Sequence, residues 1–406
     1  MNILVLQETD WLTRGPHTQH HIFERLSKNK NIKVTVLDYD IDKTTRNSSL
    51  ILKTKEYLNI SKVVDNSRVK IIRTSHLQLA HFSRISSLIT NFFKMIQIIK
   101  TSRPDIIIAF SITNGFIGLI LSKIFHIPYA FFYIDILHEL VPQKYLRKIA
   151  RYTTRLNLKF SNEVFVHTKS QKEFIIKEGI NPKKIKVIPD GVDLKNTMID
   201  PSKIQKLKER YVISEKHFVI FFMGFLYHFA GLEEIIKYYN EKVSKGEFNL
   251  KLIILGDGGI YDHLKECVEK LKADWVILAG RVPFSEITEY IALSNLCLLS
   301  FEINHITKEI LPIKILEYMA MKKPVLSTAL PGVVKELGNK SGIIFTKNQL
   351  ELIKKIEDLH NRKDELEKKG EKGYQLVKEH YNWDNIVNDF KIYILKIIKD
   401  YYNHFK

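Results

Sequence analysis

Short apolar runs alternate with amphipathic stretches along the first half of the chain. Runs with the length and apolar content of strands occur at residues 3–6, 34–37, 69–72, 106–110, 129–134, 164–167 and 185–188. Patterns with helical periodicity lie between these runs, as at residues 20–28 and 171–178. This alternation predicts a parallel, doubly wound sheet.

A second alternation of the same kind follows a turn-rich segment at residues 189–191. Its strand-like runs occur at residues 218–222, 250–255, 275–278, 296–300, 324–327 and 343–345. Residues 350–381 are charged and have a helical pattern, and residues 383–405 are amphipathic and aromatic. We therefore predict an α/β protein of two Rossmann-like, doubly wound domains that face each other, with a ligand-binding cleft at the carboxyl ends of the strands.

Composition agrees with two ordinary globular domains. The length of 406 residues is comfortable for two domains, and 45% of the residues are hydrophobic. The two cysteines make no disulfide framework and no His/Cys spacing indicates structural zinc, so we expect a reducing, cytoplasmic environment. The start of the chain lacks the features of a signal peptide. Residues 106–136 could span a membrane by length, but a turn at 113–115 and Pro128 favour strand–helix–strand.

The chain carries a net charge of +18, and residues 84–159 hold eleven cations against three anions. Residues 84–100 and 143–160 have helical periodicity, and each combines an apolar stripe with a basic face. Such helices can lie on anionic lipid, where each cation contributes about 1 kcal/mol. The alternative is a solvated basic face over an ordinary core stripe, and the sequence does not decide between the two. Nucleic acid is disfavoured as a partner, because no recognised nucleic-acid motif accompanies the charge.

The most informative segment lies between residues 308 and 320, where Glu309 and Glu317 stand eight positions apart. Pro312 is predicted to be the first residue of a helix, so that Glu309 precedes the helix and Glu317 lies inside it. Lys314 then falls in the first turn, where a cation meets the positive end of the helix dipole. An anion held at that helix end would explain this placement, because helix N-termini bind phosphate. The segment therefore predicts a sugar-nucleotide site, and the alternative is a surface helix with a Glu/Lys pair.

This segment resembles the Glu-x7-Glu signature of retaining glycosyltransferases with the GT-B fold, in particular glycosyltransferase family 4. Further landmarks of that family have counterparts, in the same order, at residues 186–193, 222–232 and 252–259. The resemblance spans nearly the whole chain. It implies an acceptor domain, a nucleotide-sugar domain and a C-terminal helix that crosses back to the first domain, at residues 1–195, 196–380 and 381–406.

The resemblance gives several residues a role in donor binding. Glu317 would bind the ribose hydroxyls of the nucleotide, because a carboxylate accepts charge-assisted hydrogen bonds from vicinal hydroxyls. Glu309 would lie near the donor sugar. Lys314 would neutralise the diphosphate, which gathers negative charge as it leaves. The backbone at Arg281 and Val282 would contact the base.

One loop departs from the family pattern. Many members have Arg after its first glycine, here Gly224, and Lys before its second glycine, whereas this chain has Phe225 and Ala230. The phosphates must then be neutralised by other cations. Lys314 is predicted to replace the missing ones, with help from Arg281.

In the first domain, the resemblance indicates the loop after the first strand and the segment after the strand at 129–134. Gly15 would let that loop approach the donor phosphates and the acceptor. Asp135 and His138 would lie near the sugar and the reacting groups, and His138 titrates near neutrality. For Asp135 the alternative is a helix N-cap. Three histidines between residues 17 and 21 could suggest a metal site, but the family needs none and a helix start fits them equally well.

The sequence thus predicts a retaining GT-B glycosyltransferase that acts at the cytoplasmic face of the cell membrane. It would move a sugar from a nucleotide-sugar, with UDP favoured over GDP by family frequency, to a lipid-linked or cell-envelope glycan acceptor. We expect no cofactor and no metal. Two alternatives stay open: another GT-B activity, such as a nucleotide-sugar epimerase or a phosphorylase, and non-enzymatic binding of anionic membranes or nucleic acid.

Overall fold

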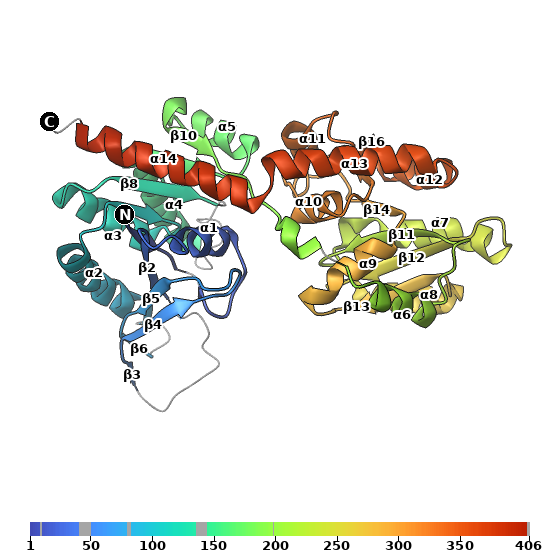
Figure 1. Cartoon of the computed structure of the whole chain (residues 1–406), viewed down its shortest axis with the longest axis horizontal. Coiled ribbons are helices and arrows are strands. Elements are labelled where there is room, and N and C mark those ends of the chain that lie inside the picture. Colours follow the sequence, from blue (N-terminus) through green and yellow to red (C-terminus); the bar gives the residue numbers. More distant parts are fainter. Residues whose placement is uncertain (9, 40–49, 79–82, 135–143, 198, 404–406) are drawn as a thin grey trace. The chain divides into compact units, whose positions relative to one another are not determined.

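The structure is a computed structural model, and it describes residues 1–8, 10–39, 50–78, 83–134, 144–197 and 199–403. The chain forms two compact units (Figure 1). Unit 1 comprises Met1–Asp190 and Trp383–Lys406, and unit 2 comprises Gly191–Asn382. The two connections between the units run side by side, because the Val192 N–H donates to the Tyr381 carbonyl at 2.8 Å. The predicted domain limits, after residues 195 and 380, lie close to these connections.

Unit 1 contains an eight-stranded sheet in the order β10-β9-β8-β7-β1-β2-β5-β4. Its strands are β1 (Asn2–Leu6), β2 (Lys33–Asp38), β4 (Lys55–Ile60), β5 (Val69–Arg73), β7 (Ile106–Ala109), β8 (Tyr129–Tyr133), β9 (Glu163–Val166) and β10 (Ile185–Val187). Only β4 pairs antiparallel to its neighbour among the described strands of this sheet. A separate antiparallel pair consists of β3 (Ile51–Leu52) and β6 (His76–Leu77). All seven predicted strands are present, whereas β3, β4 and β6 were not predicted.

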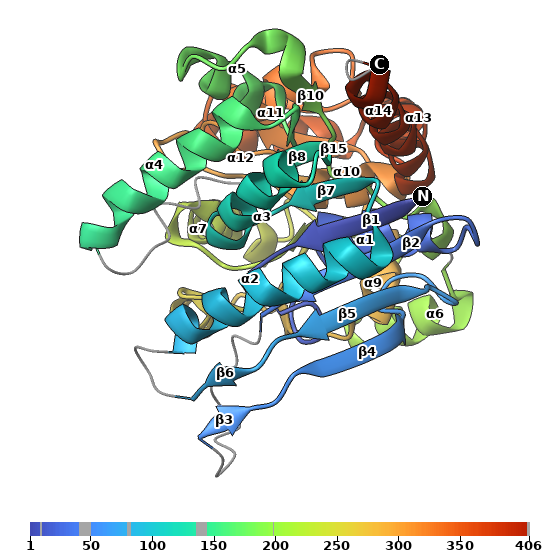
Figure 2. The same ribbon diagram turned by 90° about the vertical axis from the view of Figure 1, so that its left-hand side faces the viewer.

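Helices cover both faces of this sheet (Figure 2). Successive residues of a strand point to opposite sides, so an apolar strand presents an apolar surface on each face of the sheet. In β1, Ile3 and Val5 pack in one core cluster with α1 and α14, whereas Leu4 and Leu6 pack in another with α2 and α3. The helices of unit 1 are α1 (Thr18–Ser27), α2 (Ser83–Ser102), α3 (Thr113–Ile124), α4 (Lys144–Phe160), α5 (Lys169–Lys177) and α14 (Trp383–Asn403). Burial on both faces explains why the parallel strands are near-continuous apolar runs.

The apolar stretch at residues 106–136 contains the predicted strand–helix–strand, in which α3 connects β7 and β8. The predicted turn at residues 113–115 is the first turn of α3. One of its free backbone donors, the Asn114 N–H, is accepted by the Glu8 carboxylate at 2.7 Å. Among the described helices, none is long and apolar enough to cross a membrane.

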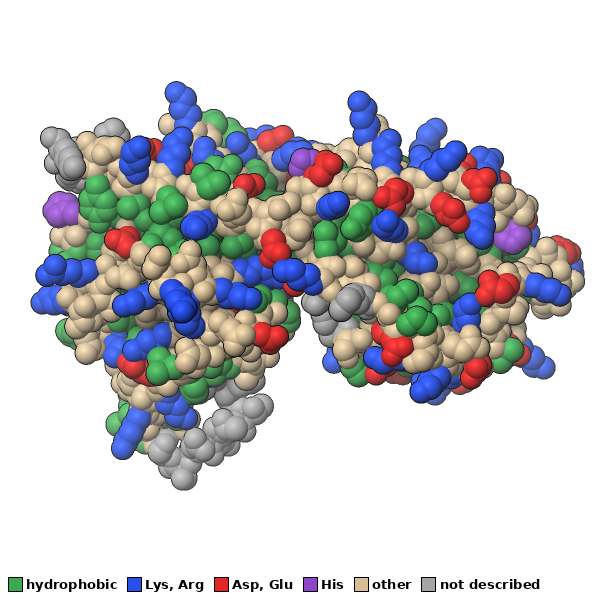
Figure 3. Space-filling view, viewed as in Figure 1, with side chains coloured by type: hydrophobic (Ala, Val, Ile, Leu, Met, Phe, Trp, Pro, Cys, Tyr) green, Lys and Arg blue, Asp and Glu red, His purple; other side chains and the backbone are tan. Residues whose placement is uncertain are grey.

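The two basic helices predicted from the charge pattern are α2 and α4, and α3 lies between them (Figure 2). On α4 the buried side chains include Asn157 and Leu158. Of the predicted apolar stripe, Ile149 is 62% and Leu146 36% exposed, whereas Ala150 and Leu156 are half-buried. Tyr145 and Tyr152, which were not part of that prediction, are 73% and 65% exposed. The predicted stripe on α4 is therefore only partly covered, and its exposed part continues in Tyr145 and Tyr152. Lys and Arg side chains also appear across the visible surface of both units (Figure 3).

Unit 2 contains a six-stranded, parallel sheet in the order β13-β12-β11-β14-β15-β16. Its strands are β11 (Phe218–Met223), β12 (Leu250–Leu255), β13 (Val276–Gly280), β14 (Leu296–Leu299), β15 (Val325–Thr328) and β16 (Ile344–Thr346). Its helices are α6 (Pro201–Arg210), α7 (Leu232–Ser244), α8 (Tyr261–Leu271), α9 (Ile287–Leu293), α10 (Ile313–Ala320), α11 (Pro331–Leu337), α12 (Gln349–His360) and α13 (Lys363–His380). The charged stretch predicted as helical forms α12 and α13. The α/β class with two Rossmann-like parallel sheets is confirmed.

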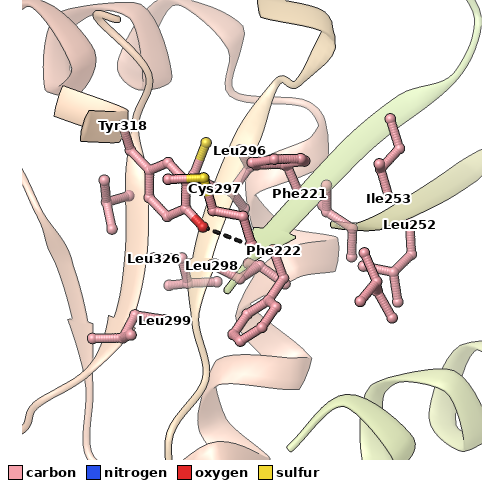
Figure 4. Packing of buried hydrophobic residues seen from close by; sticks show 14 of the residues in the cluster. Phe221, Phe222, Leu252, Ile253, Leu296, Cys297, Leu298, Leu299, Tyr318 and Leu326 are labelled. Carbon is pink, nitrogen blue, oxygen red and sulfur yellow. Dashed lines mark hydrogen bonds between the residues drawn. The ribbon is translucent and has the colours of Figure 1, made fainter. Parts of the chain in front are cut away.

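Strands β11, β12 and β14 supply much of the core of unit 2 (Figure 4). Phe221 of β11 meets Tyr318 of α10 edge to face, with ring centroids 5.8 Å apart. The Tyr318 hydroxyl accepts the Met223 N–H at 2.9 Å, so the last backbone donor of β11 is satisfied by a helix side chain. This contact fixes α10 against the carboxyl end of β11.

Candidate functional site

The carboxyl edge of the unit 2 sheet is lined with glycines. Gly224 follows β11, Gly256 follows β12, and both have positive φ angles, +123° and +130°. A Cβ on Gly256 would collide with the Gly224 carbonyl, so the two loops pack backbone on backbone. A Cβ on Gly224 would lie 2.6 Å from the Lys314 Nζ atom. The bare backbone at Gly224 therefore makes room for the Lys314 ammonium group.

Helix α10 brings the predicted Lys314 and Glu317 together on one element. The helix begins at Ile313, and Pro312 is its N-cap rather than its first residue. Pro312 has extended backbone with ψ of 125°, which explains the shift by one position. Lys314 still lies in the first turn, as predicted, and Glu317 lies three residues further along the helix.

The Lys314 side chain is half-buried among aromatic rings. Its Nζ atom is 4.1 Å from the centre of the Phe222 ring and 5.0 Å from that of Phe301. Among the described residues, no hydrogen-bond acceptor or ion-pair partner contacts this ammonium group. Burial lowers the pKa of Lys314 from 10.5 to about 7, although Glu317 acts in the opposite direction. Cation–π attraction is thus the direct support that the charge receives.

Glu317 is also half-buried, and it has no hydrogen-bond donor among the residues that the structure describes. Burial raises the pKa of Glu317 from 4.5 to about 6, and Lys314 opposes this shift. Buried polar groups in proteins nearly always have partners. A cation and a carboxylate that both lack them, beside a helix N-terminus, form an arrangement that can hold a phosphate and a hydroxyl-bearing group.

Glu309 lies in the loop between β14 and α10, and its side chain is exposed. The loop has a defined shape, because Asn304 Oδ1 accepts the N–H groups of Ile306 at 2.9 Å and Thr307 at 3.1 Å. The Gly332 N–H of α11 donates to the backbone carbonyl just before Glu309 at 2.7 Å. Glu309 is therefore presented to solvent from a fixed loop, and no described contact assigns it a structural role.

Arg281 directly follows β13, and its side chain is 76% exposed. Its Nε atom lies 2.7 Å from Asp257 Oδ2, so its charge already has a partner. Val282 is half-buried beside it. Arg281 thus stands at the same sheet edge as Gly224, but it is a less available cation than Lys314. The predicted backbone contacts of Arg281 and Val282 with a base stay predictions.

The two positions that lack the family's cations have different surroundings. Phe225 is exposed, and Ala230 is fully buried, with its carbonyl accepting the Ser300 hydroxyl. Neither contributes a charge near Lys314. Sequence analysis missed the roles of Phe222 and Phe301, since both lie in apolar runs that are typical of core strands.

In unit 1, two of the three histidines after β1 are structural. His20 is buried; its Nδ1 accepts the His17 N–H at 3.0 Å and its Nε2 donates to the Trp11 carbonyl at 3.0 Å. Burial lowers the pKa of His20 to about 4. His21 stacks on Trp383, with ring centroids 4.5 Å apart, and its pKa falls to about 3 for the same reason. Both rings are therefore neutral near pH 7. No group of three potential metal-ligating side chains gathers anywhere in the described ranges.

Gly15 lies in the loop after β1 with a φ of +87°. A Cβ there would lie 2.8 Å from the His17 backbone nitrogen, so the tight loop requires glycine. Lys62 stabilises the same loop, because its Nζ donates to the carbonyls of Trp11 at 3.3 Å and Leu12 at 3.1 Å. The exposed backbone at Gly15 can therefore be approached closely by a ligand. The predicted residues Asp135 and His138 lie outside the described residues.

Comparisons with known proteins agree on the class of protein. Residues 20–196 match the family model "Glycosyltransferase Family 4", and residues 217–362 match "Glycosyl transferases group 1". Together the two models cover most of the chain. An uncharacterized glycosyltransferase of Methanocaldococcus jannaschii is 25% identical over 247 residues, which are 58% of this chain and 59% of that relative. The matching region thus spans little more than half of that curated relative.

Solved structures show the same fold over nearly the full length. HepE of Anabaena in complex with UDP and glucose has a TM-score of 0.69 at 17% identity, covering 98% of this chain and 100% of that one. Sucrose-phosphate synthase of Thermosynechococcus elongatus has a TM-score of 0.70 at 12% identity, covering 98% and 99%. These likenesses confirm the predicted two-domain fold.

Proposed function

The chain is a GT-B glycosyltransferase by its fold and by the two family models that match its domains, and from this premise we propose that it is a retaining enzyme. It transfers a sugar from a nucleotide-sugar to a lipid-linked or cell-envelope glycan. A UDP-sugar is the favoured donor, because the similar HepE structures contain UDP, UDP with glucose, or UDP-glucose. A GDP-sugar is the second choice.

One observation carries this proposal: Lys314 is a half-buried cation without an anionic partner among the described residues. The first N–H groups of α10 also lack intrahelical acceptors. A nucleoside diphosphate would supply the negative charge that both require. Glu317, further along α10, is assigned the ribose hydroxyls, because its carboxylate has no other donor within the described ranges.

The proposed reaction is a front-side displacement. The bond between the anomeric carbon and the β-phosphate oxygen breaks while the acceptor hydroxyl bonds to the same carbon on the same face. The hydroxyl proton passes to an oxygen of the departing phosphate, so that the products are a glycoside and a nucleoside diphosphate. Lys314 and the N-terminus of α10 stabilise the charge that develops on the leaving group.

The remaining predicted residues orient the reactants in this scheme. Glu309 is assigned to the donor sugar, since its carboxylate is presented from a fixed loop just before α10. Gly15 is assigned to close approach of the first-domain loop to the phosphates. Asp135 and His138 are assigned to the sugar and the reacting groups on resemblance alone. The scheme requires no metal or cofactor, because Lys314 supplies the positive charge at the diphosphate.

The test is thermal stabilisation of the full chain by UDP-, GDP-, ADP- and dTDP-sugars. We expect one class of nucleotide to raise the melting temperature, since a ligand that binds only the folded state stabilises it. Glu317→Ala should remove this shift, whereas Glu379→Ala, an exposed carboxylate on α13, should retain it. No shift with any nucleotide would overturn the proposal. An epimerase would convert its sugar nucleotide without an acceptor, and a phosphorylase would show the absorbance of pyridoxal phosphate.

A lipid-linked acceptor would be reached at a membrane surface, and unit 1 has a surface suited to binding one. Apolar side chains are exposed on the three neighbouring helices α2, α3 and α4; among them are Ile85, Ile89, Phe93, Ile124, Ile149 and Tyr152. Lys148, Arg151 and Arg155 are exposed on α4 beside the apolar stripe. An exposed apolar stripe flanked by cations favours the surface of an anionic bilayer. We therefore propose that unit 1 docks on anionic lipid at the cytoplasmic face of the cell membrane.

Vesicle co-sedimentation tests this docking. The chain should bind phosphatidylcholine vesicles that contain phosphatidylglycerol and should bind pure phosphatidylcholine weakly. Ile149→Glu with Tyr152→Glu should abolish binding, whereas Ile392→Glu, an equally apolar and exposed position on α14, should not. Binding that survives the double change, or that double-stranded DNA competes away completely, would contradict the proposal and favour a nucleic-acid partner.

A further inference from the structure

Two aromatic side chains stand exposed in the loop after β11. Phe225 is 48% exposed and Tyr227 is 44% exposed, and their ring centroids lie 4.6 Å apart. Tyr227 stacks on Phe229 at 4.7 Å with an interplanar angle of 12°, and Phe229 meets Phe301 edge to face at 5.2 Å. A continuous row of rings therefore runs from the surface to Phe301, which is one of the two rings that flank Lys314.

The backbone under these rings is held in place at both ends. The Leu226 N–H donates to the Asp257 carbonyl at 2.9 Å, and the Ile260 N–H donates to the Leu226 carbonyl at 3.3 Å. Further along, Gln349 Nε2 donates to the Phe229 carbonyl at 3.2 Å. The rings are thus pre-positioned, and a ligand that contacts them does not have to order the loop first.

The row of rings adjoins the candidate anion site. Phe225 follows Gly224 directly, and the position of a Cβ on Gly224 is only 2.6 Å from Lys314 Nζ. A diphosphate bound at Lys314 would therefore carry its attached groups past the exposed rings. An arginine is common at position 225 in the resembled family and would contact phosphate, whereas a phenylalanine offers an apolar face. The replacement of arginine by phenylalanine at position 225 therefore favours contact with an apolar part of the ligand rather than with its phosphates.

We propose that Phe225 and Tyr227 form a stacking platform for the sugar ring of the donor, and that they contribute to donor-sugar specificity. This inference rests on the proposed function and names the part of the donor that this loop recognises. One face of a pyranose presents C–H groups with partial positive charge, and the face of an aromatic ring is negative, so the two attract. The base, the other flat part of the donor, is assigned to the segment after β13.

The test separates sugar contacts from nucleotide contacts. Dissociation constants of UDP and UDP-glucose are measured by calorimetry on the full chain and on Phe225→Leu and Tyr227→Leu. Leucine keeps apolar bulk and removes the ring face. We expect each change to weaken UDP-glucose binding about tenfold and UDP binding less than about twofold. Phe174→Leu on α5, a ring of comparable exposure, is the matched control and should change neither constant. GDP and GDP-mannose are measured in parallel.

A second readout does not depend on affinity. In the wild-type complex, ring currents of Phe225 and Tyr227 should shift the pyranose proton resonances upfield in the NMR spectrum of bound UDP-glucose. Phe225→Leu should reduce this shift, even if the ligand concentration is raised to keep the variant saturated.

The possible outcomes distinguish this inference from the proposed function. If the wild type binds neither nucleotide pair, the proposed function fails and the stacking platform fails with it. If UDP binds but the two leucine changes weaken UDP and UDP-glucose equally, or change neither, the donor site stands and the platform is refuted. Selective loss of the sugar nucleotide, together with loss of the ring-current shift, supports the platform.

Discussion

A charged Lys314 lowers the stability of the folded protein, because burial disfavours its charge. Burial lowers its pKa from 10.5 to about 7, so between these pH values the unfolded chain binds a proton that the folded chain does not. Stability therefore rises with pH across this window, as far as Lys314 contributes. A residue that destabilises the free protein and has no partner in the described structure is typical of a functional site.

Lys314→Met should separate binding from stability. Methionine fits the aromatic surroundings of Phe222 and Phe301 without a charge, so we expect the melting temperature of the free protein to rise by about 2–4 °C at pH 7. The affinity for the nucleotide-sugar should fall at least about tenfold, because a charge-assisted contact is lost. Scanning calorimetry measures the melting temperature, and titration calorimetry measures the affinity for the nucleotide-sugar. A lower melting temperature with unchanged affinity would instead identify Lys314 as a structural residue, and exposed Lys308→Met is the control.

Donor affinity should depend on pH on both sides of neutrality. Above about pH 7, Lys314 loses its proton in the free protein, so binding must take up a proton and weakens by up to about tenfold per pH unit. Below about pH 6, Glu317 becomes protonated and loses its capacity to accept from two ribose hydroxyls. UDP-glucose is the suitable probe, because neither of its phosphates has a second ionisation near pH 7.

Lys314→Arg is the variant that checks this pH dependence. A guanidinium stays charged across the whole range, so the alkaline decline should disappear while the acidic decline remains. A wild-type affinity that is constant from about pH 7 to pH 9 would contradict the assignment of Lys314 to the diphosphate.

At the scale of elements, the position of α10 depends on the bond from Met223 N–H to the Tyr318 hydroxyl. Tyr318→Phe leaves this buried backbone donor without a partner and should cost about 1–3 kcal/mol in urea unfolding. Tyr290→Phe is the comparison, because among the described residues the Tyr290 hydroxyl hydrogen-bonds to another side-chain hydroxyl, that of Tyr211, at 3.1 Å, and not to a backbone donor; a smaller loss is expected. A weaker effect of Tyr318→Phe than of Tyr290→Phe would contradict this account.

Apolar runs predicted the parallel strands, because a strand buried on both faces has few polar positions. Strand β4 was missed for the same physical reason: its residues are exposed or half-buried, and no apolar run marks them. It pairs antiparallel with β5, the next strand along the chain, and this pairing depends on both segments. Pairing of this kind cannot be read from the pattern of one segment.

The candidate site was predictable only where spacing along one helix decides it. Glu317 and Lys314 could be assigned to one helix from Pro312 and the eight-residue spacing. The contact of Lys314 with Phe222 and Phe301 could not, because the two rings come from different strand ends and meet only in the folded sheet. Distant segments supply the environment that shifts the pKa of Lys314.

For the whole molecule, net charge alone does not select a partner. Lys and Arg side chains are spread over the visible surface of both units (Figure 3), so the cations that make up the net charge of +18 are not confined to one unit. What distinguishes α4 is the exposed apolar stripe that accompanies its cations. Screening by salt should therefore weaken lipid binding without abolishing it, because the apolar part persists.

Unit 1 includes the C-terminal helix α14, whereas unit 2 does not. Unit 2 is continuous in sequence, whereas unit 1 needs α14, whose buried residues include Trp383, Phe390 and Ile394. Six residues of α14 are buried. At about 1.5–3 kcal/mol each, their burial contributes roughly 9–18 kcal/mol, which is comparable to the whole stability of a typical domain, about 5–15 kcal/mol. Truncation after Asn382 should therefore unfold unit 1 and leave unit 2 folded.

The measurement is calorimetry with limited proteolysis, with nucleotide added. The truncated chain should lose one thermal transition and keep a protease-resistant fragment near residues 191–382 that still binds the donor nucleotide. Within the full chain, Phe390→Ala should cost about 3–5 kcal/mol, whereas Ile392→Ala, exposed on the same helix, should be nearly neutral. If the truncated chain lost both transitions together, folding of unit 2 would depend on unit 1, and the donor site could not be treated as a property of unit 2 alone.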